Sequence, residues 1–189
     1  VRGLVAGLDE GGPPLRAVVH TAGVMGASPL AELQPEELTE ALAAKVGGAW
    51  NLHRALGERE LDAFVLYGSI AGLWGAGHQA AYGAANAGLE ALGSFRRGRG
   101  LCATTLHWGP WAGEGLLSSG EGFGDGEQHL RKRGLVPMGA EHALQGLDVA
   151  LRSGGDSLAV VNVDWSRFAP VFAFSRPRPF FEGVQEARA

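Results

Sequence analysis

Cysteine, lysine and long apolar runs are scarce in this 189-residue sequence. The single cysteine, Cys102, lies in the apolar run CATTLHW, which indicates a buried small side chain in a reducing compartment. A catalytic thiol would need a cationic neighbour or a helix N-terminus, and the sequence indicates neither. No apolar run approaches the roughly 20 residues that cross a bilayer, and the N-terminus has no basic segment followed by an apolar core. We therefore expect a cytoplasmic protein with no membrane partner.

An extended basic stretch is also missing. The formal net charge is -4, and phosphate contacts need clustered Lys and Arg side chains, so we expect no nucleic-acid partner. The run RRGRG at 96–100 is interpreted as the solvated C-terminus of a helix, where cations meet the negative end of the helix dipole. The six histidines form no pair, with each other or with cysteine, at metal-ligand spacing, so we predict no metal site.

The rest of the composition is typical of one folded, soluble unit, with 46% hydrophobic and 19% charged residues. Short apolar runs that predict strands alternate with stretches of helical periodicity. The predicted strands are 17–20, 64–67, 103–108 and 158–163, and the predicted helices are 1–8, 36–56, 80–97, 127–133 and 140–152. This alternation predicts an α/β fold with a parallel sheet and helices on both faces.

Glycines alternate in the segment GEGFGDG at 120–126, within a longer glycine-rich stretch, 109–126. Such a run could be a phosphate cradle or a lid loop. A phosphate loop needs a strand directly before it and a helix directly after it, and neither neighbour fits well. We therefore predict a lid region over 112–138.

Three candidate site segments follow predicted strands: HTAGV at 20–24, Ser69, and WGP at 108–110. In an open α/β sheet the ligand lies at the carboxyl ends of the strands. Tyr82 and Lys45 fall on the helices that flank these ends. A serine hydroxyl and a phenol that face one point can donate a proton to an oxygen, so we predict a proton-donating site here.

The sequence resembles the ketoreductase domains of modular polyketide synthases, a branch of the short-chain dehydrogenase/reductases. Seven motifs carry the resemblance, in order, over essentially the whole chain. They are LRAVVHTAGV, AAKVGGAWNLH, FVLYGSIAG, QAAYGAANA, LHWGPW, VDWSRF and RPRPFF. The resemblance implies a Rossmann-like fold that reduces a β-ketoacyl group on an acyl carrier protein with NADPH, alongside other synthase domains.

The resemblance also implies catalytic roles. Tyr82 would protonate the ketone oxygen, and Ser69, thirteen residues earlier, would orient it. Lys45 and Asn86 would complete the set, in positions exchanged relative to the wider superfamily. A nearby ammonium would lower the pKa of the phenol from about 10 toward neutrality. Taken singly, these residues have ordinary alternatives: a core tyrosine, loop or helix caps, and a lysine that extends to the surface.

By the same resemblance, the loops after the strands would bind the cofactor. The implied residues are His20, Thr21, Ala22, Gly23, Lys45, Tyr82, Trp108, Gly109 and Pro110. Ordinary turn chemistry and a core tryptophan remain the alternative for these loops. The family's G-x-G-x-x-G turn has no counterpart before His20. We therefore expect the C-terminal part of a larger domain, which lacks the first three strands and binds NADPH weakly without its N-terminal part.

Four residues bear on stereochemistry through the resemblance. One stereochemical type has Leu-Asp-Asp where this chain has Met-Gly-Ala, beginning at Met25. The opposite, A type has a tryptophan eight residues before the catalytic tyrosine, and Trp74 is at that position. A histidine three residues before the tyrosine would indicate epimerised α-substituents, but Gln79 is there and His78 is one place earlier. We expect the A1 subtype, which gives an L-hydroxyl without epimerisation; Trp74 as mere packing is the alternative.

Two other functions remain open from the sequence. The chain could belong to a catalytically silent structural domain of a megasynthase, or to a stand-alone short-chain reductase. The intact set of Ser69, Tyr82, Lys45 and Asn86 counts against the silent domain, and the VDWSRF and RPRPFF motifs favour a synthase domain.

Overall fold

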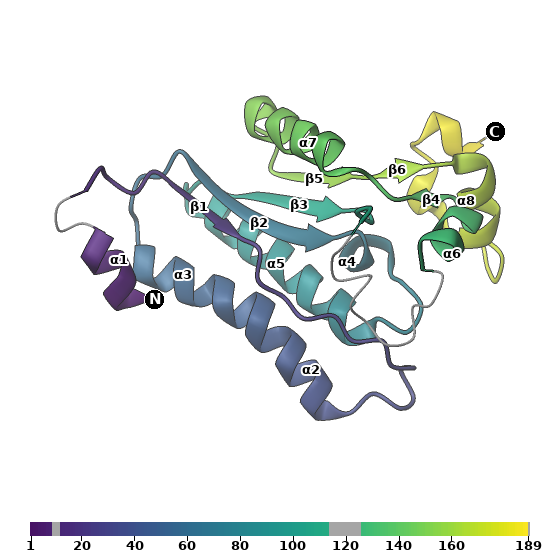
Figure 1. Cartoon of the computed structure of the whole chain (residues 1–189), viewed down its shortest axis with the longest axis horizontal. Coiled ribbons are helices and arrows are strands. Elements are labelled where there is room, and N and C mark those ends of the chain that lie inside the picture. The colour runs from purple at the N-terminus through teal and green to yellow at the C-terminus, as the bar shows by residue number, and fades with distance from the viewer. Residues whose placement is uncertain (9–11, 114–125, 189) are drawn as a thin grey trace. The chain divides into compact units, whose positions relative to one another are not determined.

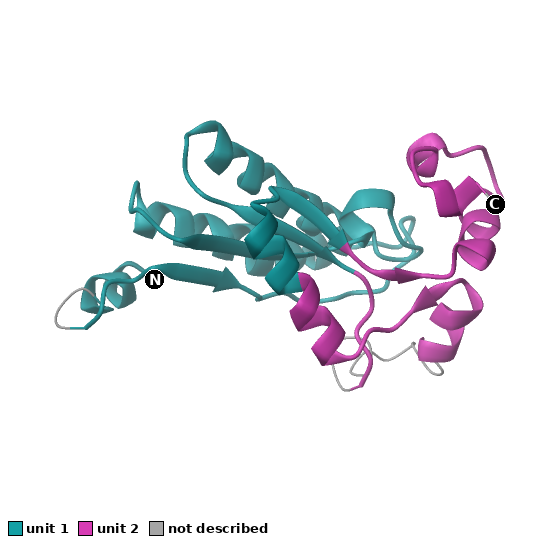
Figure 2. Cartoon of the chain, turned by 90° about the horizontal axis from the view of Figure 1, so that it is seen from above, with its two compact units in different colours: residues 1–108, 147–159 teal, residues 109–146, 160–189 magenta. Residues whose placement is uncertain are grey.

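The structure is a computed structural model that describes residues 1–8, 12–113 and 126–188 (Figure 1). The chain divides into two compact units, where its length alone predicts one (Figure 2). Unit 1 comprises Val1–Trp108 and Leu147–Ala159, and unit 2 comprises Gly109–Gly146 and Val160–Ala189. None of the helices among the described residues combines the length and apolar content needed to cross a membrane.

A four-stranded sheet with the order β1-β2-β3-β5 forms the centre of unit 1. The strands are β1 (Ala17–His20), β2 (Ala63–Ser69), β3 (Thr104–Trp108) and β5 (Ser157–Val160). β2 runs parallel to β1 and β3. Phe64, Val65 and Leu66 of β2 are all buried, which is typical of a parallel strand covered on both faces. The predicted parallel sheet is confirmed, and β1 has the predicted bounds.

Helices cover this sheet on both faces (Figure 1). α3 (Gly48–Leu56) and α5 (Ala80–Gly98) lie below it in this view, and the part of α7 (Ala140–Ser153) that belongs to unit 1, residues 147–153, lies above it. Leu89 and Leu92 of α5 pack with Leu66 of β2 in the main core, which also includes α1 (Arg2–Leu8) through Val5. Burial of these apolar side chains is the main stabilising contribution. The fold is α/β and Rossmann-like, as predicted.

The helix expected over 36–56 is interrupted. It consists of α2 (Pro35–Leu42), a π-helical segment η1 (Ala43–Gly47) and α3. Pro35 lies in the first turn of α2, as expected. In the π-helical segment the backbone bonds span one more residue than in an α-helix, and such segments are frequent at functional sites. Lys45 lies in this wide turn.

The single strand predicted over 158–163 is wrong. β5 ends at Val160, and a separate strand, β6 (Asn162–Val163), pairs antiparallel with β4 (Leu135–Val136) in unit 2. The apolar run continues through both strands, so it cannot reveal that the chain changes partner. The remaining elements include two helices that the prediction missed, α4 and α8. They are α4 (Ala71–Trp74), α6 (Gly126–Lys132), α8 (Trp165–Phe172), and the 3-10 helices η2 (Pro179–Phe181) and η3 (Gln185–Arg188).

An aromatic cluster joins the last two sequence motifs within unit 2. The rings of Trp165 and Phe168, from VDWSRF, lie 5.1 and 5.7 Å from the ring of Phe181, from RPRPFF. Aromatic pairs at this spacing attract one another beyond their buried area. Part of the predicted lid region, 114–125, lies outside the described residues, and its role as a lid stays a prediction.

The C-terminus of α5 follows the prediction except at two cations, Arg96 and Arg97; the Arg97 side chain is 18% exposed and paired with Glu90 at 3.0 Å. α5 ends at Gly98, and Gly100 adopts a φ of 73° that favours glycine. Arg96, however, is buried and not solvated. Its guanidinium lies 3.9 Å from the centre of the Phe64 ring, and its Nε donates to the carbonyl of Cys102 at 3.0 Å. A buried guanidinium needs such partners, so Arg96 is part of the core and not a surface cap.

Candidate active site

Two of the predicted strand ends lie side by side. Ser69, the last residue of β2, is paired with Trp108, the last residue of β3. Two residues earlier on β2, the ring of Tyr67 lies 5.2 Å from that of Trp108. The parallel register therefore places the serine and the tryptophan at one edge of the sheet, as the sequence predicted.

Gly109 and Pro110 follow directly in unit 2. The Gly109 N–H donates to the carbonyl of Val160 at 2.8 Å, and a Cβ on Gly109 would lie 2.6 Å from Cγ2 of Val161. This glycine is therefore required by packing within its own unit. Its role in cofactor binding, like that of Pro110, stays a prediction.

Ser69 and Tyr82 come together at the start of α5. The hydroxyl of Ser69 accepts the backbone N–H of Ala71 at 3.2 Å and forms a side-chain hydrogen bond with Tyr82. A Cβ on Gly72 would lie 2.8 Å from Cβ of Asn86, so α4 packs against α5 at a distance that only glycine allows. This close packing holds the buried Tyr82 against the end of β2.

The Lys45 side chain extends from the π-helical turn to the end of β2 and the ring of Tyr82. This side chain is only 3% exposed, and its Nζ donates to the carbonyl oxygen of Tyr67 at 3.0 Å. The ammonium lies 5.6 Å from the centre of the Tyr82 ring. A Cβ on Gly23 would lie 2.7 Å from Cε of Lys45, so the side chain passes directly against the loop after β1. Burial lowers the pKa of Lys45 to about 8.

His20 holds the backbone of that lysine. The ring is buried, and its Nε2 lies 2.9 Å from the carbonyl oxygen of Lys45. Burial lowers the pKa of His20, which favours the neutral ring with Nε2–H as the donor. Thr21 and Ala22, next along the chain, are exposed. Thr21 and Ala22 of the predicted cofactor loop are thus accessible, while the His20 ring is buried; cofactor binding by these residues stays a prediction.

Asn86 lies one turn after Tyr82 and is fully buried. Its Nδ2 donates to the backbone carbonyl of Tyr82 at 2.7 Å. Its Oδ1 is buried without a hydrogen-bond partner in the described part of the chain. A buried acceptor of this kind is costly unless water or a ligand satisfies it. The four predicted catalytic residues therefore lie together: Lys45, Tyr82 and Asn86 are buried, Ser69 is half-buried, and the unfilled acceptor belongs to Asn86 itself.

The expected lowering of the phenol pKa is wrong for this structure. Burial raises the pKa of Tyr82, and the hydrogen bonds from Ser69 and Asn86 only partly offset it. The ammonium of Lys45 is hydrogen-bonded to the Tyr67 carbonyl and lies beside the ring, not on the hydroxyl. Desolvation of the phenolate therefore dominates.

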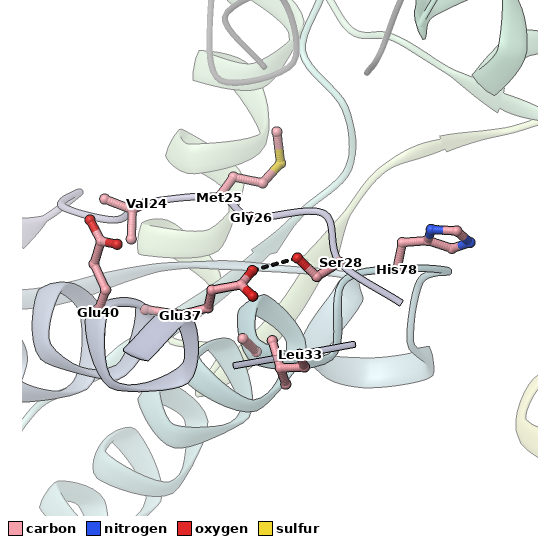
Figure 3. A pocket seen from close by; sticks show the side chains of 10 residues that line it. Val24, Met25, Gly26, Ser28, Leu33, Glu37, Glu40 and His78 are labelled. Carbon is pink, nitrogen blue, oxygen red and sulfur yellow. Dashed lines mark hydrogen bonds between the residues drawn. The ribbon is translucent and has the colours of Figure 1, made fainter. Parts of the chain in front are cut away.

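The predicted stereocontrol residues lie around the entrance to α5. Trp74 is the last residue of α4 and is half-buried. Gln79 immediately precedes α5, and its Nε2 donates to Sδ of Met25 at 3.6 Å. His78 is exposed and has a φ of 63°, which is uncommon for a residue other than glycine (Figure 3). The structure thus brings Met25 and Gln79 together and leaves the His78 side chain outside.

A polar network anchors the middle of α5. The carboxylate of Glu90 accepts hydrogen bonds from Ser157 at 2.9 Å, Arg97 at 3.0 Å and Ser94 at 3.1 Å, and its Oε2 lies 3.2 Å from Nε2 of His107. Burial alone would raise the pKa of Glu90, but these hydrogen bonds outweigh burial and lower it to about 2. The network joins the helix that carries Tyr82 to β3 and β5.

Two residues that build this cluster are not predictable from the sequence. Tyr67 contributes its backbone carbonyl to Lys45, and no side-chain pattern can indicate a backbone acceptor. Gly72 is required only because α4, which was not predicted, packs against Asn86. Neither residue had a usable signal in the sequence.

Comparison with known proteins gives the family. A family model described as the KR domain matches residues 1–113. The chain belongs to the KR domain family. Its relatives include the polyketide synthase GfsA of Streptomyces halstedii, which is 48% identical over 184 residues. That match covers 97% of this chain and 2% of the synthase.

Solved ketoreductases have the same fold. PlmKR1, from the first module of phoslactomycin biosynthesis in Streptomyces sp. HK803, is 44% identical with a TM-score of 0.88 and matches 100% of this chain. A structure described as an A1-type ketoreductase is 37% identical with a TM-score of 0.89 and matches 99% of it. The chain covers 43% and 39% of these two structures. The recognition of a polyketide ketoreductase from the sequence motifs is confirmed.

Proposed function

We propose that this chain contributes the proton-donating and stereocontrolling part of an NADPH-dependent β-ketoacyl reductase. Its substrate is a β-ketoacyl chain carried by an acyl carrier protein, within a synthase that supplies the other domains. One observation carries the proposal: the half-buried Ser69 is hydrogen-bonded to the buried Tyr82, and the buried ammonium of Lys45 lies beside the Tyr82 ring. Membership of the KR family supports the reaction class.

The residues around this cluster fit a nicotinamide cofactor. Lys45 uses one of its three N–H donors on the Tyr67 carbonyl, which leaves two for ribose hydroxyls. Thr21 and Ala22 are exposed, and Gly23 has no side chain, so the Lys45 ammonium can lie directly against this loop. These residues would hold the nicotinamide end, and NADPH when bound supplies the hydride.

The side chains then act on the ketone oxygen. Ser69 donates a hydrogen bond that orients the carbonyl, and Tyr82 transfers its phenolic proton to the same oxygen. The raised pKa of Tyr82 keeps the phenol protonated at neutral pH, which is the form that reduction needs. Lys45, whose pKa is about 8, is mainly an ammonium at pH 7 and stabilises the phenolate that remains. The C=O double bond is lost, and new C–H and O–H bonds form.

Trp74 and Gln79 lie at the two ends of the segment that connects α4 to α5. From this position they can select the face of the ketone that meets Tyr82. We assign the A1 subtype, with an L-hydroxyl and no α-epimerisation, because Trp74 and Gln79 occupy the positions that the resemblance associates with that subtype.

The test is reduction of a β-ketoacyl thioester by the complete ketoreductase domain with NADPH, comparing wild type with Tyr82→Phe. Loss of the general acid should slow reduction about 100- to 10,000-fold. The thermal midpoint, measured in parallel, checks that the variant is folded. An unchanged rate would refute the assigned mechanism, a mainly D-hydroxyl product would refute the subtype, and an inactive wild type would favour the silent structural domain.

A further inference from the structure

A small cavity of about 160 Å³ is lined on one side by the loop that follows β1 and on the other by α2 (Figure 3). Its apolar wall includes Val24 of this loop, Leu33, Ala41 of α2 and Ala81 of α5. The cavity leaves residues 24–28 without close packing on this side. Their position must therefore be fixed by specific contacts, because dense packing does not fix it.

Glu37 makes the first of these contacts from the rigid start of α2. Its Oε2 accepts a hydrogen bond from the hydroxyl of Ser28, drawn as a dashed line in Figure 3. Its Oε1 accepts the backbone N–H of Gln34 at 3.1 Å. The hydrogen bonds from Ser28 and Gln34 lower the pKa of Glu37, so the side chain stays a carboxylate with both oxygens engaged. The loop is thereby tied to a helix N-terminus.

Ser28 passes this restraint to the entrance of α5. Its backbone forms a parallel β-bridge with Gln79, and the Gln79 side chain also contacts Met25. The Gln79 carbonyl accepts the N–H of Gly83 at 2.7 Å in the first turn of α5. A displacement of Ser28 would therefore also displace Gln79 and, through the backbone hydrogen bond of Gln79, Gly83, which is next to Tyr82.

The adjacent backbone conformation requires such a restraint. His78 has a φ of 63°, a sparsely populated conformation that persists only where surrounding contacts fix it. The bridge between Ser28 and Gln79 is directly next to it. Without the hydrogen bond to Glu37, the loop could move into the cavity. The backbone of His78 and Gln79 would then lose the contact that fixes its conformation.

We propose that Glu37 and Ser28 are positioning residues whose hydrogen bond fixes Gln79, and so the face of the ketone that is presented to Tyr82. Neither side chain touches the reacting atoms; both act through the backbone of residue 79. The inference rests on the proposed reduction and adds a support for stereocontrol outside the residues that contact the substrate.

The test uses the complete ketoreductase domain and measures the ratio of hydroxyl stereoisomers in the product. Ser28→Ala removes the hydrogen-bond donor, and we expect the minor isomer to increase about threefold to tenfold, the range that corresponds to one ordinary hydrogen bond. Glu37→Gln replaces one of the two acceptor oxygens by an NH2 group, so the Ser28 hydroxyl and the Gln34 N–H compete for the oxygen that remains, and the ratio should shift in the same direction. The double variant should exceed Ser28→Ala by little, because both changes weaken one contact. Ser28→Thr keeps the hydroxyl and should keep the ratio.

Glu40→Gln is the matched control. Glu40 lines the same cavity from the same helix, so this variant removes an equal charge without removing the hydrogen bond to Ser28. We expect wild-type stereochemistry from it. A change in the ratio as large as that of Glu37→Gln would show that charge at the cavity, and not the clamp, is responsible, and would overturn the inference.

Hydrogen–deuterium exchange over residues 76–83 separates this inference from the proposed function. Exchange should rise in Ser28→Ala whether or not the domain reduces the thioester. If wild type is inactive and exchange still rises, the positioning stands and the reductase proposal fails. If wild type is active and Ser28→Ala changes neither exchange nor product ratio, the clamp is refuted; a rise in exchange with a constant ratio refutes its part in stereocontrol.

Discussion

The Nε2 atom of His20 lies 2.9 Å from the carbonyl oxygen of Lys45. This contact joins the last residue of β1 to the π-helical turn that carries the lysine. A Cβ on Gly48 would lie 3.0 Å from the same ring, so the helix approaches the strand closely at this point. The strand that leads into the proposed cofactor loop therefore also fixes the backbone of a proposed catalytic residue.

Replacement of His20 by Phe should damage both stability and activity. The Lys45 carbonyl would lose its partner in a buried position, which costs about 1–3 kcal/mol. We expect a lower thermal midpoint of the complete domain and about a tenfold fall in kcat/KM, because a small displacement of a catalytic group is costly. His20→Gln, whose amide can donate to the same carbonyl, should recover part of both. An equal thermal midpoint and an equal kcat/KM for wild type and His20→Phe would show that this hydrogen bond does not position Lys45.

The pH dependence of reduction should report on Lys45. Its pKa is lowered by burial to about 8, so the ammonium that stabilises the phenolate is lost as the pH rises through that value. We expect the reduction rate to fall about tenfold per pH unit above it. Lys45→Met should be slow and should lack this alkaline limb. A rate that stays constant from neutral pH to pH 9.5 would contradict this role.

Burial of the Lys45 ammonium lowers the stability of the folded chain, and the direction of its pH dependence follows from the lowered pKa. The folded-state pKa of about 8 lies below the ordinary value of 10.5, so the folded state disfavours the charged form. Stability should therefore rise as the pH increases from 8 to 10.5, when the unfolded chain still binds the proton. Thermal midpoints measured over this interval check the slope. Lys45→Met should be at least as stable as wild type at pH 7, and a large loss of stability there would contradict the interpretation.

Gly23→Ala should impair activity more than folding. The added Cβ would meet Cε of Lys45 at 2.7 Å and Nζ at 3.0 Å, so the flexible end of that side chain must move. We expect a clear fall in kcat/KM with a change of only a few degrees in the thermal midpoint. Gly98→Ala is the control, because its Cβ would meet nothing within 4 Å. Equal activities of the two variants would show that Lys45 tolerates the displacement.

Glu90 should control stability in acid. Its folded-state pKa of about 2 lies below the ordinary 4.5, so its contribution is complete above pH 4.5 and is lost as the pH falls toward 2. The difference corresponds to about 3 kcal/mol of unfolding free energy. Glu90→Gln should be less stable at pH 7 and should lose less on acidification, as measured by urea unfolding. If the unfolding free energies of wild type and Glu90→Gln fell in parallel as the pH decreased, groups other than Glu90 would be responsible for the loss of stability in acid.

The main elements were predictable because their signals are local. β1 is a short apolar run that ends at His20, and α5 follows a clear helical period between Gln79 and Gly98. The break between Val160 and Asn162 was not predictable, because the same apolar run serves two strands with different partners. The π-helical segment was equally hidden, since the apolar spacing of a helix does not distinguish a π-helical turn from an α-helical one.

The site was predictable to the extent that motifs define it. Ser69, Tyr82, Lys45 and Asn86 lie together in the structure, as the family resemblance implied. The direction of the Tyr82 pKa was not predictable, because it depends on how far burial outweighs the neighbouring groups. Backbone contacts, such as those of Lys45 with residues 20 and 67, leave no trace in side-chain patterns.

The wide turn at Ala43–Gly47 has a consequence for the spacing of this sequence. The buried positions Ala41, Lys45 and Ala49 recur every four residues, whereas an α-helix turns once in about 3.6 residues and would rotate them progressively out of line. The extra residue of the π-helical turn absorbs this drift and keeps all three on one face. We expect that deletion of one residue from this turn would restore a regular helix and keep most of its packing, while it moves the lysine away from the tyrosine. A one-residue deletion, which a sequence alignment would treat as minor, would then leave the fold stable but abolish the proposed reduction.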